Sequence, residues 1–142
     1  MEDAGFNPNW SRSSHGQDKS IARIFAYMRH GYFVDLGANH AEFDSNTFAL
    51  ERRMNWTGLC VEPNPRYWAG YEGRTCQVFK AVVGRNDGDE VPFALWHQNS
   101  GIVGEHFDNL WSSSNVLLWQ MQALVLKAAR WSPLSSGYAQ GL

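Results

Sequence analysis

Three short segments place polar or small residues where buried β-strands are expected to end. VDLGAN spans residues 34–39, CVEPNP spans residues 60–65, and AVVG spans residues 81–84. In open α/β sheets, ligands bind beyond the carboxyl ends of the strands. Asp35 would lie near such a crevice, and Gly37 would let the backbone approach a ligand or adopt a conformation closed to other residues. We therefore expect these segments to line one ligand-binding crevice.

The acidic residue of the second segment indicates the kind of ligand. Glu62 closes the second predicted strand and lies 25 positions after Gly37. An acid at about this separation is placed to accept two hydrogen bonds from a ribose diol. Ala81 and Val82, at the end of the third predicted strand, could flank a purine ring. The pattern favours an adenosine-containing ligand.

The first turn distinguishes between two such ligands. A dinucleotide fingerprint requires G-x-G-x-x-G, whereas residues 37–42 contain only its first glycine, Gly37. Glu42 stands where a glycine would serve a pyrophosphate, and its charge would repel that anion. S-adenosylmethionine contains adenosine but no phosphate. The turn therefore favours S-adenosylmethionine, and an NAD-type dinucleotide domain is the less favoured alternative.

The elements that would position these residues alternate along the chain. An apolar stripe predicts a helix over 18–30, in which Ile21, Ile24, Phe25 and Met28 share one face. A short apolar strand follows over Tyr32–Leu36.

Capping residues mark the next two helices. A helix should begin near Ser45 or Asn46, either of which could cap it. The second strand is expected over Gly58–Val61. Asn64 and Pro65 then predict a cap and the first turn of a helix that ends at Gly73.

The later part of the chain predicts more strands and one long helix. A third strand over Gln77–Val83, a turn over 85–88 and a strand over Val91–Trp96 together suggest a hairpin. Residues 114–131 read as a helix, and residues 1–13 as a flexible lead. Strands alternating with helices predict a mostly parallel α/β sheet with helices on both faces.

Composition excludes several classes of protein. The 142 residues suit one domain, 44% of them are hydrophobic, and the net charge of −2 gives no sign of a nucleic-acid surface. No apolar run is long enough to span a membrane, and the first residues lack the apolar core of a secretory signal. Cys60 and Cys76 fit no metal motif and suggest two buried thiols in a reducing compartment. We expect a cytoplasmic protein without a metal site.

Several motifs occur in an order that resembles a known family. They are HGQDKSI (15–21), GYFVDLGANH (31–40), SNTFALER (45–52), WTGLCVEPNPRYW (56–68) and CQVFKAVVG (76–84), with SGIVGE (100–105) as a possible continuation. Over residues 14–105 the chain resembles the FkbM-type S-adenosylmethionine-dependent methyltransferases. The resemblance implies a Rossmann-like fold, S-adenosylmethionine as cofactor, and methyl transfer, usually to a hydroxyl oxygen of an acceptor.

The resemblance also implies roles for individual residues. Four residues would lie beside the methionine and ribose portions of the cofactor: Asp35, Gly37, Ala38 and Asn39. Glu62 would bind the ribose hydroxyls, with Asn64 near the adenine. Asn46 and Thr47 would line the pocket, and Gln17 and Asp18 would close it from the N-terminal side.

The chain departs from the family pattern after residue 105. Members of the family continue with a buried strand carrying a D-x-E-G-type motif, and no such string follows here. Residues 106–142 instead suggest a divergent helix and tail through which the chain could self-associate, so the fold would be truncated at its C-terminal end. The alternative function is a cofactor-binding or interaction module that performs no transfer. No residue is singled out as the catalytic base, although His40 lies in the cofactor turn, and His97 and His106 are further candidates.

Overall fold

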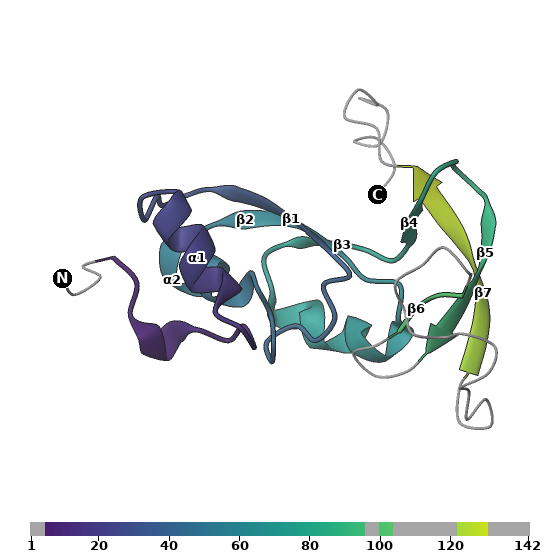
Figure 1. Cartoon of the computed structure of the whole chain (residues 1–142), viewed down its shortest axis with the longest axis horizontal. Helices are drawn as coiled ribbons and strands as arrows, with labels where there is room; N and C mark the ends of the chain where they lie inside the picture. Colours follow the sequence, from purple (N-terminus) through teal and green to yellow (C-terminus); the bar gives the residue numbers. More distant parts are fainter. Residues whose placement is uncertain (1–4, 96–99, 104–121, 131–142) are drawn as a thin grey trace. The chain divides into compact units, whose positions relative to one another are not determined.

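The computed structural model describes residues 5–95, 100–103 and 122–130 (Figure 1). The chain divides into two compact units, Met1–Lys80 and Ala81–Leu142. This division falls inside the range 14–105 that the sequence predicts as one domain. Each unit is described by itself below.

The first unit contains a three-stranded parallel sheet in the order β1-β2-β3. The strands are β1 (Tyr32–Leu36), β2 (Thr57–Val61) and β3 (Gln77–Phe79). Asp35 lies beside Cys60 in the register of the first pair. The connections carry α2 (Phe48–Met54) and the 3-10 helix η2 (Pro65–Gly73), and α1 (Gln17–Ile24) precedes the sheet. The predicted α/β arrangement is confirmed for this unit, and the first two strands lie where the sequence places them.

One of the two predicted caps is found at its helix start. The N-cap of α2 is Thr47, whose side chain makes no capping bond, although the Ser45 hydroxyl oxygen accepts the backbone N–H of Phe48 at 3.1 Å. The Asn64 side chain accepts the N–H of Arg66 at 3.0 Å, and η2 ends at Gly73 as expected. The prediction of an α-helix after Asn64 is wrong in type, because the whole element is a 3-10 helix.

The first helix is shorter than predicted, and of its apolar stripe only Ile21 is partly buried and packs against the core. It ends at Ile24, and positive φ angles at Ala26 and Tyr27 then break the helical path. Ile24, Phe25 and Met28 are 77%, 50% and 44% exposed. Asp18 and Ala22 are buried instead, because the Asp18 carboxylate accepts N–H and O–H groups of residues 11–13.

The N-terminal segment differs from the expected flexible lead. Pro8–Trp10 forms the 3-10 helix η1, which Asn7 caps. Phe6 is buried in the core and meets the Trp10 ring edge-on. The described part of this segment is therefore packed against the unit.

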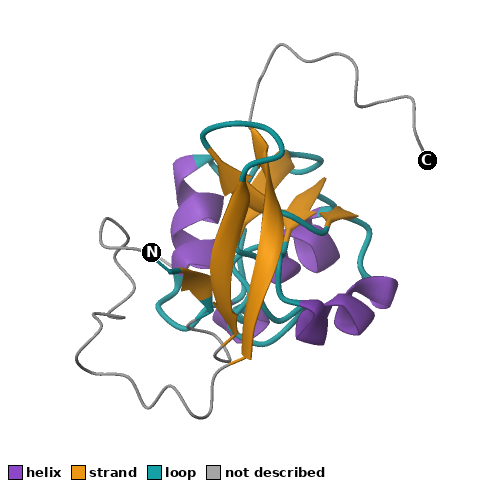
Figure 2. Cartoon of the chain, turned by 90° about the vertical axis from the view of Figure 1, so that its right-hand side faces the viewer, coloured by secondary structure: helices purple, strands orange, loops and turns teal. Residues whose placement is uncertain are grey.

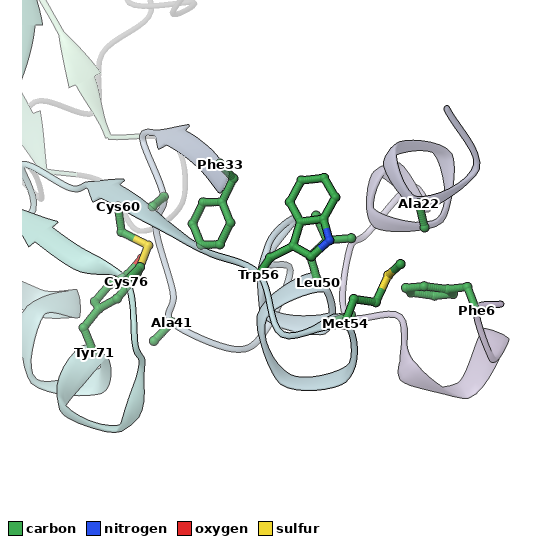
Figure 3. Packing of buried hydrophobic residues seen from close by; sticks show 12 residues of the cluster. Phe6, Ala22, Phe33, Ala41, Leu50, Met54, Trp56, Cys60, Tyr71 and Cys76 are labelled. Carbon is green, nitrogen blue, oxygen red and sulfur yellow. A yellow bond between two sulfur atoms is a disulfide. The ribbon is translucent and has the colours of Figure 1, made fainter. Parts of the chain in front are cut away.

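The core lies on one face of the sheet. Phe33, Leu50, Met54 and Trp56 belong to one buried cluster (Figure 3), which also contains Ala22 of α1. On the opposite face of β1, Tyr32, Val34 and Leu36 are 65%, 42% and 55% exposed. Helices on both faces, as expected for a complete parallel sheet, are not found among the described residues of this unit.

Cys60 and Cys76 are joined in a disulfide, which corrects the expectation of two separate thiols. Both residues are buried, and their bond links β2 to the residue that precedes β3 (Figure 3). The spacing of the two cysteines along the sequence does not indicate the bond. They become neighbours through the parallel pairing of β2 and β3.

The second unit is a four-stranded mixed sheet in the order β4-β7-β5-β6 (Figures 1 and 2). Its strands are β4 (Val82–Gly84), β5 (Glu90–Leu95), β6 (Gly101–Ile102) and β7 (Gln122–Arg130). The third predicted strand is thus two strands, β3 and β4, in separate sheets. The predicted hairpin is wrong, because β7 lies between β4 and β5.

The predicted helix over 114–131 is also wrong where it can be assessed. Residues 122–130 form β7, parallel to β4 and antiparallel to β5, whereas residues 114–121 and 131 lie outside the described residues. A long apolar run suits both a buried helix and a central strand, and pairing on both edges decides for the strand. Among the described residues, no helix has the length and apolarity to cross a membrane.

The disulfide gives a first prediction. Its cysteines are 16 positions apart, and a closed loop of this size stabilises a fold by about 3 kcal/mol through the unfolded chain. Reducing the bond should lower the free energy of unfolding by about that amount in urea titrations. The double variant Cys60→Ala/Cys76→Ala should not respond to reductant. Equal stability of the oxidised and reduced protein would contradict the prediction.

Candidate functional site

Two carboxylates lie at the carboxyl ends of adjacent parallel strands. Asp35, near the end of β1, accepts the Thr47 hydroxyl at 2.7 Å. Glu62 follows β2 directly and is 4% exposed. Its two oxygens accept the backbone N–H groups of Asn39 and Asn64, both at 2.6 Å. Glu62 thereby holds the turn after β1 against the chain that leaves β2.

The first three backbone amides of that turn donate to the end of β2 and to the residue that follows it. The N–H groups of Gly37 and Ala38 donate to the Val61 carbonyl at 2.9 and 3.1 Å. Gly37 has a φ of 68°, and a Cβ there would meet nothing within 4 Å, so the glycine serves the left-handed backbone and not a close contact. With the Asn39 amide on Glu62, three successive amides bond to protein acceptors.

Burial sets the electrostatics of the two acids. It raises the pKa of Asp35, which the Thr47 hydrogen bond and the Arg74 charge partly oppose. Burial also raises the pKa of Glu62, against the hydrogen bonds from Asn64 and Asn39, and the charge of Asp35 raises it further. The two carboxylates therefore interact unfavourably with each other, and a positive charge nearby would relieve both.

Arg74 organises the site, although sequence reasoning did not single it out. Its guanidinium binds Glu51 at 2.8 Å, and both side chains are almost fully buried. It also donates to the Ala41 carbonyl and, at 3.1 Å, to the Thr47 hydroxyl. The sequence contained one signal for such a residue. Glu51 lies one helical turn after Thr47 and next to Leu50, which is buried. An acid that is buried there requires a cationic partner.

Tyr71 is a second residue that sequence reasoning did not place at the site. Its phenol donates to the Asn39 carbonyl at 2.8 Å. Burial raises its pKa, and the charges of Glu62 and Asp35 raise it further. The phenol therefore stays protonated and fixes the turn from the side of η2.

The predicted residues of the N-terminal side meet the start of α2. The Ser13 hydroxyl donates to Asn46 at 2.8 Å and also contacts the Gln17 side chain. Asp18 is fully buried and accepts the N–H of Arg12 at 2.9 Å. In this arrangement Asp18 anchors residues 11–13, and Gln17 and Asn46 lie together.

The remaining predicted residues fall into two groups. Asn64 is buried and caps η2 while its amide donates to Glu62, so it belongs to the site edge. Ala81 and Val82 belong to the second unit, where Val82 begins β4. His97 and His106 lie outside the described residues.

The arrangement can bind a cationic group more readily than an anion. The amides of residues 37–39 have protein acceptors, and the adjacent side chains are carboxylates. Among the described residues, no group of three or more His, Cys, Asp or Glu side chains could hold a metal ion. Comparison with protein-family models, curated proteins and solved structures found no match to this chain.

The buried ion pair gives a second prediction. Arg74→Met leaves the Glu51 carboxylate buried without its cation and should lower the free energy of unfolding by about 3–5 kcal/mol. Chemical denaturation measures the change. The matched variant Arg66→Met removes an exposed arginine of η2 and should change stability by less than about 0.5 kcal/mol. Equal effects of the two variants would contradict the role given to Arg74.

The hydroxyl between Arg74 and Asp35 gives a third prediction. Thr47→Val keeps the shape of the side chain but removes a hydrogen bond that lowers the pKa of Asp35, so that pKa should rise further. The carboxyl carbon signal of Asp35, followed by NMR during a pH titration, reports the change. Thr57→Val alters an exposed threonine of β2 and should leave the pKa of Asp35 unchanged. An unchanged value in Thr47→Val would refute the coupling.

Proposed function

We propose that Met1–Lys80 binds S-adenosylmethionine and that the chain transfers its methyl group to a hydroxyl oxygen of an acceptor molecule. The observation that carries the proposal is the pair of interacting carboxylates, Asp35 and Glu62, beside a turn whose amides already have acceptors. S-adenosylmethionine supplies a methyl group on a positively charged sulfur. The FkbM resemblance adds the expected reaction class.

Charge supports this cofactor over a dinucleotide. A pyrophosphate is held by backbone N–H groups at the first turn of the sheet, and the N–H groups of Gly37, Ala38 and Asn39 donate to Val61 and Glu62. A dinucleotide would also bring negative charge toward two acids whose pKa values are already raised. A ligand with a net positive charge is favoured by the same two groups.

The residues present fit the cofactor in this chemical sense. Asp35 and Glu62 are acceptors for ammonium and hydroxyl groups. A carboxylate offers about four acceptor positions, so the two amide bonds to Glu62 do not exhaust its capacity for a ribose diol. Tyr71 and Arg74 hold the turn and Thr47 in place around them.

Positioning would be the main task of these residues during transfer. Displacement at the methyl carbon depends on alignment of the two reactants, and a base is needed only where the acceptor must lose its proton. The rigid edge built by Glu62, Arg74 and Tyr71 would provide that alignment for the cofactor.

A second candidate is a module that binds the cofactor without transferring its methyl group. In open doubly wound sheets the ligand crevice lies where the strand order reverses, so the first strand has neighbours on both sides. In the described part of the first unit, β1 is an edge strand. This observation favours a site that is incomplete on the side of β1.

Calorimetry tests the binding step. S-adenosylmethionine should bind, NAD should not, and the uncharged thioether S-adenosylhomocysteine should bind more weakly because it lacks the sulfonium charge. Glu62→Ala should weaken binding by at most about 3 kcal/mol, the value of charge-assisted hydrogen bonds. Affinity should fall as the pH is lowered through the raised pKa values of Asp35 and Glu62, since protonation removes the charges that attract the cation.

Two controls complete the experiment. Glu72→Ala removes an exposed acid of η2 and should leave affinity unchanged. Radiolabelled cofactor with a panel of hydroxylated acceptors then separates the candidates, because binding without turnover favours the non-transferring module. Failure of the intact protein to bind S-adenosylmethionine would refute both.

A further inference from the structure

Three rings gather on the turn beside the candidate site. The His40 ring lies 4.9 Å from the ring of Phe43, centroid to centroid, at an interplanar angle of 56°. It lies 6.1 Å from the ring of Tyr67, nearly edge-on at 67°. His40 and Phe43 come from the turn after β1, and Tyr67 comes from η2. We call these three residues the ring cluster.

The backbone fixes the orientation and hydrogen-bonding role of His40. Its Nδ1 accepts the N–H groups of Glu42 and Phe43, both at 3.1 Å. An imidazole nitrogen that accepts carries no proton, so in the neutral ring the proton is on Nε2. His40 therefore offers an N–H donor away from the backbone. In this tautomer Nε2 donates a hydrogen bond and does not accept one.

Phe43 gives the cluster an accessible apolar surface. The Phe43 side chain is 63% exposed. The neighbouring His40 ring is held by hydrogen bonds from the backbone of the turn. An exposed aromatic side chain is available to stack on a ligand ring. Tyr67 places a phenol beside it. Burial raises the pKa of that phenol, while the charge of Arg66 lowers it and the charge of Glu62 raises it. The cluster thus combines a flat apolar face with two polar hydrogens.

The cluster adjoins the site that the proposed function assigns to the cofactor. His40 follows Asn39, whose amide donates to Glu62, and Tyr67 lies close enough to Glu62 to feel its charge. A molecule stacked on Phe43 would therefore lie next to the acidic edge. This placement suits the acceptor of a transfer reaction more than a distant surface ligand.

Resting on the proposed function, we propose that His40, Phe43 and Tyr67 bind the methyl acceptor, and that this acceptor is an uncharged ring compound with hydroxyl groups at its edge. The ring stacks on Phe43, while the His40 Nε2–H and the Tyr67 phenol bond to its oxygens. Phenols and pyranose sugars share this chemistry.

Charges of both signs lie around the cluster and favour an uncharged acceptor. Arg66 and Glu62 both lie close enough to Tyr67 to act on the pKa of its phenol. On the other side, Glu42 is paired with Arg12 at 3.3 Å on the surface, which leaves no excess positive charge there. A carboxylate-bearing ring would be attracted by Arg66 and repelled by Glu62, whereas an uncharged ring is subject to neither effect.

NMR titration of the full chain tests the proposal with three probes: catechol, methyl β-glucoside and benzoate at millimolar concentration. Catechol or the glucoside should shift the His40 ring signals, and which of them does so distinguishes an aromatic from a carbohydrate source. Benzoate should bind more weakly than catechol. Phe43→Ala should weaken binding of the effective probe about tenfold, through loss of the stacking surface.

Two variants separate ring contact from fold. His40→Asn keeps a side-chain acceptor for the amides of the turn, as in an Asx turn, but removes the ring, and should weaken probe binding while thermal unfolding is preserved. Tyr32→Ala removes a ring that is 65% exposed on β1 and should change probe affinity by less than about twofold. Nitrogen chemical shifts of His40 should report the Nε2–H form.

The outcomes are distinguishable from those of the proposed function. No shift with either neutral probe, equal losses in Phe43→Ala and Tyr32→Ala, or benzoate binding as well as catechol would overturn the acceptor assignment. Calorimetry with S-adenosylmethionine on the same sample is read separately. Cofactor binding with no response of the rings removes only this proposal, whereas ring binding without cofactor binding removes the proposed function and keeps the cluster as a ring-binding surface.

Discussion

The first unit depends on the buried ion pair between Arg74 and Glu51. A buried charge is very costly unless it is paired and hydrogen-bonded, so the segments that satisfy Arg74 have to meet. Those segments are the turn at Ala41, the start of α2 at Thr47 and the end of η2. The Thr47 hydroxyl in turn donates a hydrogen bond to Asp35, which fixes the position of that carboxylate. One guanidinium thereby determines where the acid of β1 is held.

Glu62 supplies the complementary constraint on the same edge. It draws the amides of Asn39 and Asn64 together, while the disulfide closes the chain between Cys60 and Cys76. That loop contains Glu62, the whole of η2 and Arg74. The residues that shape the candidate site from the second strand onward are therefore enclosed by one covalent bond and held from inside by two buried charged groups.

The sequence predicts the parts of this unit that local chemistry controls. The strands Tyr32–Leu36 and 58–61 are short apolar runs bounded by glycine, asparagine and proline, and the cap at Asn64 follows from side-chain type. The buried face of α1 was missed because Asp18, not the isoleucine stripe, contacts residues 11–13. The strand β7, the disulfide and the role of Arg74 depend on partners distant in sequence. Apolar pattern and residue spacing contain no information about those partners.

The contacts around Arg74 also bear on the order in which the chain can fold. They join residues 23 to 33 positions apart, and β1 and β2 pair residues 25 positions apart. Non-local pairing of this kind forms more slowly than local contacts, but all of it lies within the first unit. On the ribosome, where domains form as units from the N-terminus, residues 5–80 contain all the partners of Arg74 described above. The acidic edge can therefore be assembled while the strands of the second unit are still being synthesised.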